Sequence, residues 1–519
     1  MRTIHVFGNL SVSRDQKELL LLREHAYFMG TNVKSSKNKN GMENWTGIPH
    51  ELMQFVQRNT YSLLIKGFAG TGKTTLSLSI LRALKVKSNF FYISTRISPK
   101  QLFLYYPWLG RFIGSSKASQ TDDVPGQGYS LSIFEDARLD EPESLFERIT
   151  NQLMDVKAPI IIIDSWDAIA SFMDKEARLN NERVLQIWRE RAGAKLIFIT
   201  EDPNYTTLDF LVDGIVELRR KFYTDMIIRE IFLSKLRGIM IHKPSYVYSL
   251  NAAIFTTCGS YHPADFAFNV ASTRLNKKEH VLSLLSPGRY ITTGYHELDD
   301  ILGGGFVQKG VILIDMESDV SAWVAVAFLS SIISNFIRTS NIVLFHPFDG
   351  INAKDVMTYL RLEPNSNTDE SRVKILCYDE ELDEKSNQNF RPLKDEHRYL
   401  EKYLESFHEV ITKTRLEYPN KLLLNIIGTD AAQKLTAQAD IAQTNISSFI
   451  RRNSDLSIIV SRKMRNIHQH FSNVCDVRLR FFVLNGSLFL QSVVPWRHLY
   501  WVLSPSSSGC STIKLKPVV

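Results

Sequence analysis

Cysteine is scarce in this 519-residue chain, and the few cysteines that occur are widely spaced. They are Cys258, Cys377, Cys475 and Cys510, and none belongs to a C-x-x-C pair. Such spacing argues against a structural metal site and against a disulfide framework. Few cysteines are typical of a reducing compartment, so we expect a cytoplasmic protein. The first residues, Met1 to Phe7, also lack the apolar core of a secretory signal peptide.

A large excess of one charge is also missing. Lys and Arg number 62 and Asp and Glu 55, which gives a formal net charge of +7. This balance permits contact with nucleic acid or an anionic surface but predicts neither. The stretch most like a membrane span, residues 321–337, is short and contains serines and an asparagine. We interpret it as a buried core helix and expect no membrane contact.

The most specific motif in the chain is a phosphate-binding loop. A chain of this length is expected to form two to four domains. In its first part, residues 67–75, GFAGTGKTT, match the pattern G-x-x-x-x-G-K-[ST]. The apolar run 61–66 before it predicts a strand, and residues 75–84 after it predict a helix. The alternative is a glycine-rich turn without a ligand, which this context disfavours.

The residue types of this loop suit nucleotide binding. Glycines let backbone N–H groups turn towards phosphates, and the start of the following helix adds its positive dipole end. Lys73 is expected to reach the β- and γ-phosphates, and the Thr74 hydroxyl to ligate Mg²⁺. We therefore predict that ATP and Mg²⁺ are bound by Gly67, Phe68, Ala69, Gly70, Thr71, Gly72, Lys73, Thr74 and Thr75.

Strand-like and helix-like stretches alternate after the loop, which predicts an α/β fold. Apolar runs at 89–94, 159–163 and 194–200 are typical of strands in a mostly parallel sheet with helices on both faces. Residues 143–156 have helical spacing. Beyond them, alternating runs predict an antiparallel extension of the sheet at 215–218, 226–236 and 246–255.

A second start indicates an internal repeat. The Thr-Gly…His-Glu-Leu pattern of residues 46–52 recurs at 293–298, and a strand-like run follows each copy. A chance match is the alternative to duplication. The second copy has lost the phosphate loop, because residues 316–323 contain no glycine and Ala322 replaces the lysine. We predict an N-terminal extension at 1–45 whose order is left open, an ATP-binding domain at 46–258, a linker at 259–286 and a degenerate domain at 287–519.

These motifs together resemble the KaiC-like branch of RecA-type ATPases. The resemblance rests on the loop at 67–75 and on Glu-Leu-Asp-Asp-Ile-Leu-Gly-Gly-Gly at 297–305. With the stretches at 92–100 and 232–238, the first half is more specifically similar to the GvpD family of archaeal gas-vesicle regulatory proteins. It implies tandem RecA-like P-loop domains, the second degenerate.

The resemblance also implies further site residues. Asp164 matches the Walker-B aspartate that holds Mg²⁺, and in the second copy Gly428-Thr429 stands where the first has Asp164-Ser165. Glu201 occupies the place of a sensor near the γ-phosphate, with a plain strand-end cap as the alternative. Lys73, Asp164 and Glu201 are thus the expected catalytic set. Lys235 and Arg237 match the element that reaches a neighbouring subunit's ATP, with a solvated basic strand as the alternative.

One departure from the family bears on turnover. KaiC-like ATPases place paired glutamates at the end of the second strand, where this chain has Arg96-Ile97. Loss of general-base assistance typically slows a reaction by about 10²–10⁴-fold. Glu135 or Asp136 are the substitutes that the sequence offers. We expect ATP to be held more readily than it is hydrolysed.

We therefore favour a regulatory ATP-binding protein that acts through a protein partner. By family analogy the partner is a transcription factor. The element at Lys235 and Arg237 implies a homo-oligomer, with a monomer as the alternative. The alternative is an active ATPase that works on DNA, but the loop at 127–130 is short and uncharged. An autophosphorylating kinase is a third reading, and the missing glutamates argue against it. The acidic run 379–384 and the pair His468 and His470 are interpreted as solvated loops.

Overall fold

The fold is taken from a computed structural model. It describes residues 46–87, 89–113, 132–138, 142–153, 156–174, 176, 181, 185, 189–190, 193–204, 207–224, 226–267, 285–286, 289–346, 351, 353–360, 373–378, 390–393, 401–428, 448–462, 471–505 and 513–519. The extension at 1–45, the loops at 127–130 and 379–384, and His468 and His470 lie outside these residues, as does most of the expected linker.

Nine of the described strands form the first sheet, in the order β3-β2-β4-β5-β1-β6-β7-β8-β9. Neighbours from β3 to β6 are parallel, and the pairs from β6 to β9 are antiparallel. The predicted parallel sheet with an antiparallel extension is therefore confirmed. The strands are β1 (Tyr61–Gly67), β2 (Phe90–Ser94), β3 (Ser132–Asp136), β4 (Ile160–Asp164), β5 (Lys195–Thr200), β6 (Gly214–Tyr223), β7 (Met226–Leu236), β8 (Ser245–Ser249) and β9 (Thr256–Thr257).

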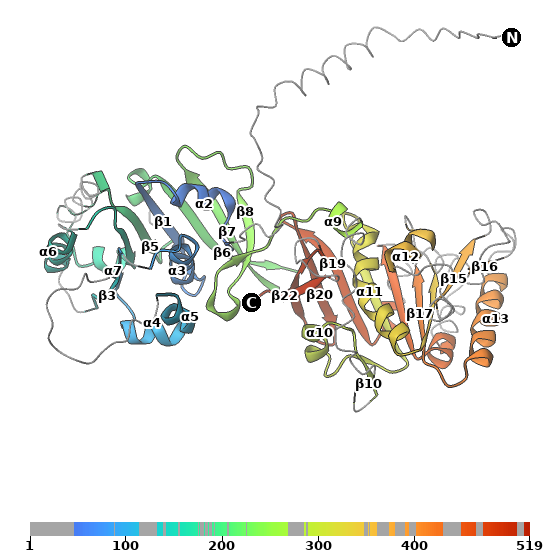
Figure 1. Ribbon diagram of the computed structural model, residues 1–519. Helices are drawn as coiled ribbons and strands as arrows, with labels where there is room; N and C mark the ends of the chain where they lie inside the picture. Colours follow the sequence, from blue (N-terminus) through green and yellow to red (C-terminus); the bar gives the residue numbers. More distant parts are fainter. Residues whose placement is uncertain are drawn as a thin grey trace, which may run out of the picture. The chain divides into compact units, whose positions relative to one another are not determined.

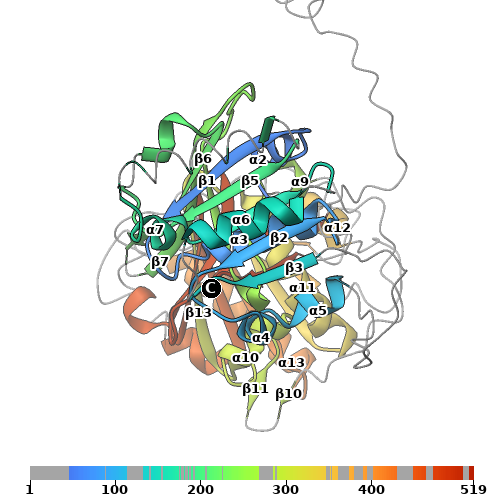
Figure 2. The same cartoon turned by 90° about the vertical axis from the view of Figure 1, so that its left-hand side faces the viewer.

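Helices cover both faces of this sheet because its central strands are apolar on both sides (Figure 1). In β1, Leu63 and Ile65 point to one core and Leu64 to the other. The helices on the first face are α2 (His50–Val56), α3 (Lys73–Ala83), α4 (Pro99–Tyr105) and α5 (Pro107–Ile113). Those on the opposite face are α6 (Pro142–Leu153) and α7 (Trp166–Ala170). Figure 2 shows α6 lying along the sheet.

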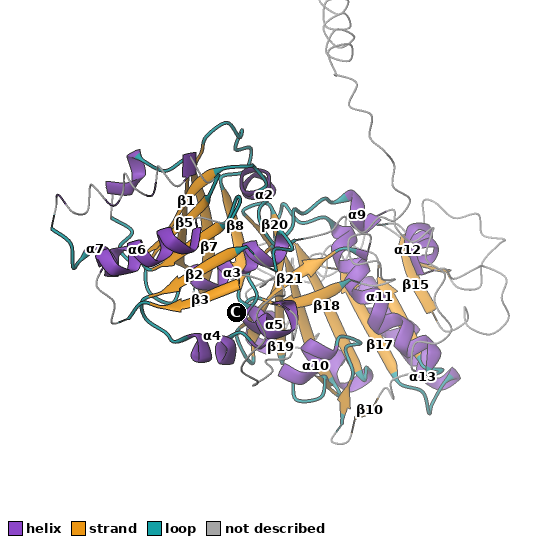
Figure 3. Ribbon diagram, turned by 60° about the vertical axis from the view of Figure 1, so that its left-hand side comes forward, coloured by secondary structure: helices purple, strands orange, loops and turns teal. Residues whose placement is uncertain are grey.

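The second half repeats this arrangement. Its described strands follow the order β16-β15-β14-β17-β18-β13-β19-β20-β21-β22 (Figure 3). Without the edge strand β16, this order matches the first sheet strand by strand, with β13 in the place of β1, and the strand directions match as well. The strands are β13 (Gly310–Met316), β14 (Ile342–His346), β15 (Val373–Tyr378), β16 (Phe390–Leu393), β17 (Leu423–Gly428), β18 (Leu456–Arg462), β19 (Val477–Leu484), β20 (Ser487–Val494), β21 (His498–Leu503) and β22 (Lys514–Pro517). The predicted tandem RecA-like fold is confirmed.

The apolar stretch at 321–337 is a core helix of this half. It forms α11 (Ala322–Arg338), whose buried side chains pack against the second sheet. Among the helices that the structure describes, none has both the length and the apolar character needed to cross a bilayer. Further helices described in this half include α10 (His296–Ile301), α12 (Ala353–Leu360) and α13 (Glu401–Glu417). A small sheet joins β10 (Leu285–Ser286), β11 (Tyr290–Ile291) and β12 (Phe306–Val307).

The antiparallel strands of the two sheets pack against each other. An apolar cluster joins Ile228 and Val247 of the first sheet to Phe482 and Trp501 of the second. Tyr223 stacks on Phe482 with ring centroids 5.3 Å apart. Because β6 to β8 also back the phosphate loop, this apolar contact places the second half close to the structural support of the site.

Candidate nucleotide-binding site

The phosphate loop joins the end of β1 to the start of α3, as the sequence predicts. Gly67 closes β1, and Gly72 caps the N-terminus of α3 with a positive φ of 93°. A side chain at Gly67 would place its Cβ 2.5 Å from the carbonyl oxygen of Leu218. The motif glycines are therefore required by close backbone approach and by left-handed geometry.

Lys73 lies inside the loop with its ammonium turned towards the loop carbonyls. Its side chain is buried, and Nζ donates to the carbonyl oxygens of Gly67 at 2.7 Å and Phe68 at 3.0 Å. Burial lowers the pKa of Lys73, and the negative charges of Glu201 and Asp164 oppose that effect. An anion held by the loop would meet a buried cation already positioned beside its backbone.

Thr74 and Asp164 face each other across the site, as expected of Mg²⁺ ligands. The Thr74 hydroxyl donates to Oδ2 of Asp164 at 2.6 Å, and the hydroxyl of Tyr92 donates to the same oxygen at 2.6 Å. Burial raises the pKa of Asp164, while these two hydrogen bonds and the charge of Lys73 lower it. The oxygen donors fit a magnesium ion, which takes few protein ligands when it also binds phosphates. The described residues contain no group of three or more acidic, His or Cys side chains that could hold a metal alone.

Arg96 and Glu201 form an ion pair beside this constellation. Their strands, β2 and β5, flank β4, and the guanidinium of Arg96 lies 2.7 Å from Oε2 of Glu201. The backbone N–H of Glu201 donates to Asp167 at 2.9 Å. The position where the family has a glutamate thus carries a cation bound to the expected sensor residue.

The two acids that the sequence offered as substitutes are engaged elsewhere. Asp136 accepts two hydrogen bonds from the guanidinium of Arg138, at 2.7 and 2.6 Å, and these bonds lower the pKa of its carboxyl. Glu135 lies 3.5 Å from Arg148. Both carboxylates therefore have cationic partners at the β3 edge of the sheet.

Three residues outside the motif support the loop, from β6, from β8 and from the turn that follows β8. Arg220 donates to the carbonyl of Ala69, and the hydroxyl of Tyr248 donates to the carbonyl of Thr71. Leu250 packs so closely on Gly72 that a Cβ there would lie 2.8 Å from its methyl groups. Sequence reasoning missed these contacts, and it also missed Tyr92, because no local motif marks residues that meet the loop only through strand pairing.

Lys235 and Arg237 lie at the other end of the strands from the phosphate loop. Leu236 pairs with Gly214 at the start of β6, whereas Gly67 pairs with Leu218 further along that strand. The ammonium of Lys235 donates to the carbonyls of Asp209 and Val212, at 2.8 and 2.7 Å. The side chain of Arg237, one residue beyond β7, is mostly exposed, with Asp213 at 3.4 Å. Neither side chain faces its own chain's loop.

In the second half, the corresponding loop is built for other contacts. The helix α11 begins at Ala322, as α3 begins at Lys73, so the alignment of the two loops holds. Asp315 pairs with Arg478 at 2.6 Å, and Glu317 pairs with Arg480. Ala322 stands where the first loop has its lysine, no glycine remains, and the carboxylates of Asp315 and Glu317 lie beside this loop, which disfavours phosphate there.

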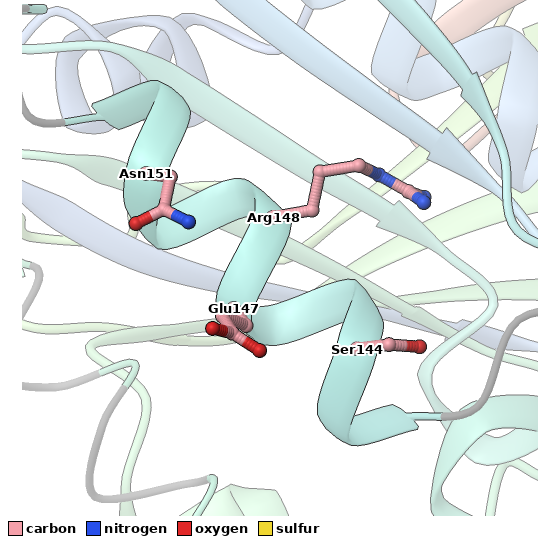
Figure 4. Close-up of a pocket in the computed structure, with 4 residues that line it drawn as sticks. All are labelled: Ser144, Glu147, Arg148 and Asn151. Carbon is pink, nitrogen blue, oxygen red and sulfur yellow. The ribbon is translucent and has the colours of Figure 1, made fainter.

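A hollow in the surface lies along α6 and is separate from the phosphate loop. Figure 4 shows its lining side chains, which all come from that helix: Ser144, Glu147, Arg148 and Asn151. A single helix supplies every polar group, and none belongs to the set built around Lys73 and Asp164.

Comparison with known proteins agrees with this geometry. Residues 52–234 match the model of the GvpD gas vesicle protein, P-loop domain. Protein GvpD2 of Halobacterium salinarum is 24% identical over 318 residues, which cover 58% of this chain and 62% of the relative. Protein GvpD1 of the same organism is 26% identical over 295 residues, 54% of this chain and 53% of the relative.

More distant relatives include the circadian clock oscillator protein KaiC of Prochlorococcus marinus. It is 25% identical over 270 residues, which cover 49% of each chain. The chain thus spans about half to three-fifths of the length of the curated relatives it matches. The chain is similar to the KaiC-like, RecA-type P-loop proteins, and residues 52–234 match a P-loop domain of the GvpD kind.

Proposed function

We propose that this chain is a regulatory protein whose binding of ATP and Mg²⁺ sets its conformation or assembly, with slow hydrolysis. One observation carries the proposal. The groups expected to bind a nucleotide lie together around Lys73, Thr74 and Asp164, but Arg96, paired with Glu201, holds the position expected for a water-orienting glutamate. We further propose an ATP-binding domain at 46–258, a linker at 259–286 and a degenerate KaiC-like domain without a phosphate loop at 287–519.

Each side chain has a defined task in this scheme. The loop glycines present backbone N–H groups to the phosphates, and Lys73 exchanges its bonds to loop carbonyls for bonds to phosphate oxygens. Thr74 and Asp164 hold the magnesium ion, whose charge offsets that of the phosphates. No general base is assigned to Glu135 or Asp136, since each already pairs with an arginine. Turnover is then slower than with a glutamate by about 10²–10⁴-fold.

The regulatory output follows the relatives. KaiC is named as a circadian clock oscillator protein, and GvpD2 matches a longer part of this chain than KaiC does. We propose a protein partner that reads the ATP-bound state, a transcription factor by analogy with GvpD, and a cytoplasmic location. Lys235 and Arg237 are proposed to contact ATP of a neighbouring subunit, because they lie at the end of the strands away from their own loop.

Nucleotide affinity and turnover of the wild type and of Lys73→Ala test this function. We expect submillimolar ATP binding that is lost in the variant, together with slow turnover. Hydrolysis of several ATP per second would refute slow switching. Turnover that rises when double-stranded DNA is added would instead identify an ATPase that works on DNA, and salt-sensitive binding would accompany it.

A further inference from the structure

The ion pair between Arg96 and Glu201 lies over the end of the strand that carries Asp164. The first sheet orders β2, β4 and β5 side by side, and Ser94 pairs with Asp164, which pairs with Ile199. Arg96 follows the end of β2 and Glu201 follows the end of β5. The 2.7 Å contact between their side chains therefore bridges the carboxyl end of β4.

This position places both charges next to the phosphate-binding groups. Glu201 is the acid that most strongly raises the pKa of Lys73, and Arg96 acts on the same lysine in the opposite direction. The positive charge of Arg96 also lowers the pKa of Asp164. Arg96 and Glu201 are thus electrically coupled to the two residues between which the terminal phosphate of ATP is expected.

The pair is well suited to exchange partners. The side chain of Arg96 is 54% exposed and that of Glu201 24% exposed, so water screens their attraction. A guanidinium binds phosphate through two parallel hydrogen bonds, and phosphate carries more charge than a carboxylate.

We propose that Arg96 and Glu201 form an exchangeable ion pair that distinguishes ATP from ADP. The third phosphate draws the guanidinium of Arg96 away from Glu201, whereas ADP leaves the pair closed. This inference rests on the proposed function, because it needs a nucleotide in the loop. With ATP bound, the side chain of Glu201 is then free of Arg96, while its backbone N–H still donates to Asp167. We expect this side chain to differ most between the two nucleotide states.

Substitutions on the two sides of the pair have opposite consequences. Arg96→Ala removes the phosphate contact, so ATP affinity falls about 10-fold while ADP affinity changes little. Arg96→Lys keeps the charge but not the paired hydrogen bonds and gives an intermediate ratio. Glu201→Gln frees Arg96 in advance, so ATP binds several-fold more tightly and ADP affinity is unchanged. Arg138→Ala removes an arginine of the neighbouring strand end and serves as the matched control.

Calorimetric titration with ATP and with ADP, both with Mg²⁺, measures the affinity ratio for the full chain and these variants. Thermal unfolding without nucleotide confirms that each variant is folded. The inference is overturned if Arg96→Ala leaves the ratio of the two affinities unchanged, or if Glu201→Gln weakens ATP and ADP binding equally. If the wild type still binds ATP, either result overturns only this inference and leaves the proposed function intact. If the wild type does not bind ATP, the proposed function itself fails.

Discussion

Replacing Asp164 by asparagine should stabilise the nucleotide-free protein while weakening its response to Mg²⁺. The Asp164 carboxylate is buried beside Tyr92 and Thr74, each 2.6 Å from Oδ2. An asparagine oxygen accepts both hydrogen bonds without bringing a charge into the site. Replacing a destabilising group at a functional site typically raises the free energy of unfolding by about 0.5–2 kcal/mol. For a domain of about 200 residues, this raises the melting temperature by about 1–8 °C.

The pH dependence gives this prediction its sign. Because burial raises the pKa of Asp164 above its ordinary value of 3.8, the native state holds this proton more tightly than the unfolded state. The wild type therefore loses stability as the pH rises from 3.8 through the raised pKa, and the loss is complete above it. The gain from Asp164→Asn appears at neutral pH and vanishes below pH 3.8.

Asp136 provides a matched control at the same edge of the sheet. Its two hydrogen bonds from Arg138 lower the pKa of its carboxyl, so the charged form favours the native state. Asp136→Asn should therefore reduce stability slightly at neutral pH, and the difference should fade as the pH drops through the lowered pKa. Thermal unfolding in EDTA between pH 3 and 8 measures both variants. A lower melting temperature for Asp164→Asn at neutral pH would refute this account of its burial.

Three further predictions concern the support of the loop and the packing of the chain. Gly72→Ala should destabilise by about 2–4 kcal/mol through its positive φ and its clash with Leu250, and Leu250→Ala should recover about 1–2 kcal/mol of that loss in denaturant titrations. No recovery would mean that the clash is relieved elsewhere. Arg237→Ala should abolish ATP-dependent assembly in mass photometry, because its mostly exposed side chain is proposed to reach the neighbouring subunit's ATP; a wild type that stays monomeric with ATP contradicts this. Phe482→Ala should cost about 3–5 kcal/mol, since its ring is buried between the sheets, and an unchanged unfolding midpoint would contradict that packing.

The sequence was informative wherever a feature is local in the chain. The pattern from Gly67 to Thr75 predicts a loop between a strand and a helix, and α3 begins within it at Lys73. Unbroken apolar runs predict strands buried on both faces, as β4 shows. The recurrence of the Thr-Gly entry predicts a repeat, and the order of the two sheets bears it out.

What the sequence could not supply are contacts that depend on strand order. Arg96 and Glu201 meet only because β2 and β5 flank β4. Tyr92 reaches Asp164 for the same reason, and Tyr248 reaches the loop from an antiparallel strand far along the chain. The strand β7 ends at Leu236, as the predicted run does, so of the two basic residues Lys235 lies on the strand and Arg237 in the turn beyond it. Propensity and spacing carry no information on such pairings.

The central claim is that the intact site holds ATP rather than hydrolysing it rapidly. The most direct test is to load the full chain with ATP and Mg²⁺, remove the excess, and follow the ratio of bound ATP to bound ADP with time. Hydrolysis without a general base predicts a rate of about 0.1 per second or slower, so ATP remains the main bound nucleotide over the first seconds. Conversion of the bound ATP to ADP within the first second would contradict the account.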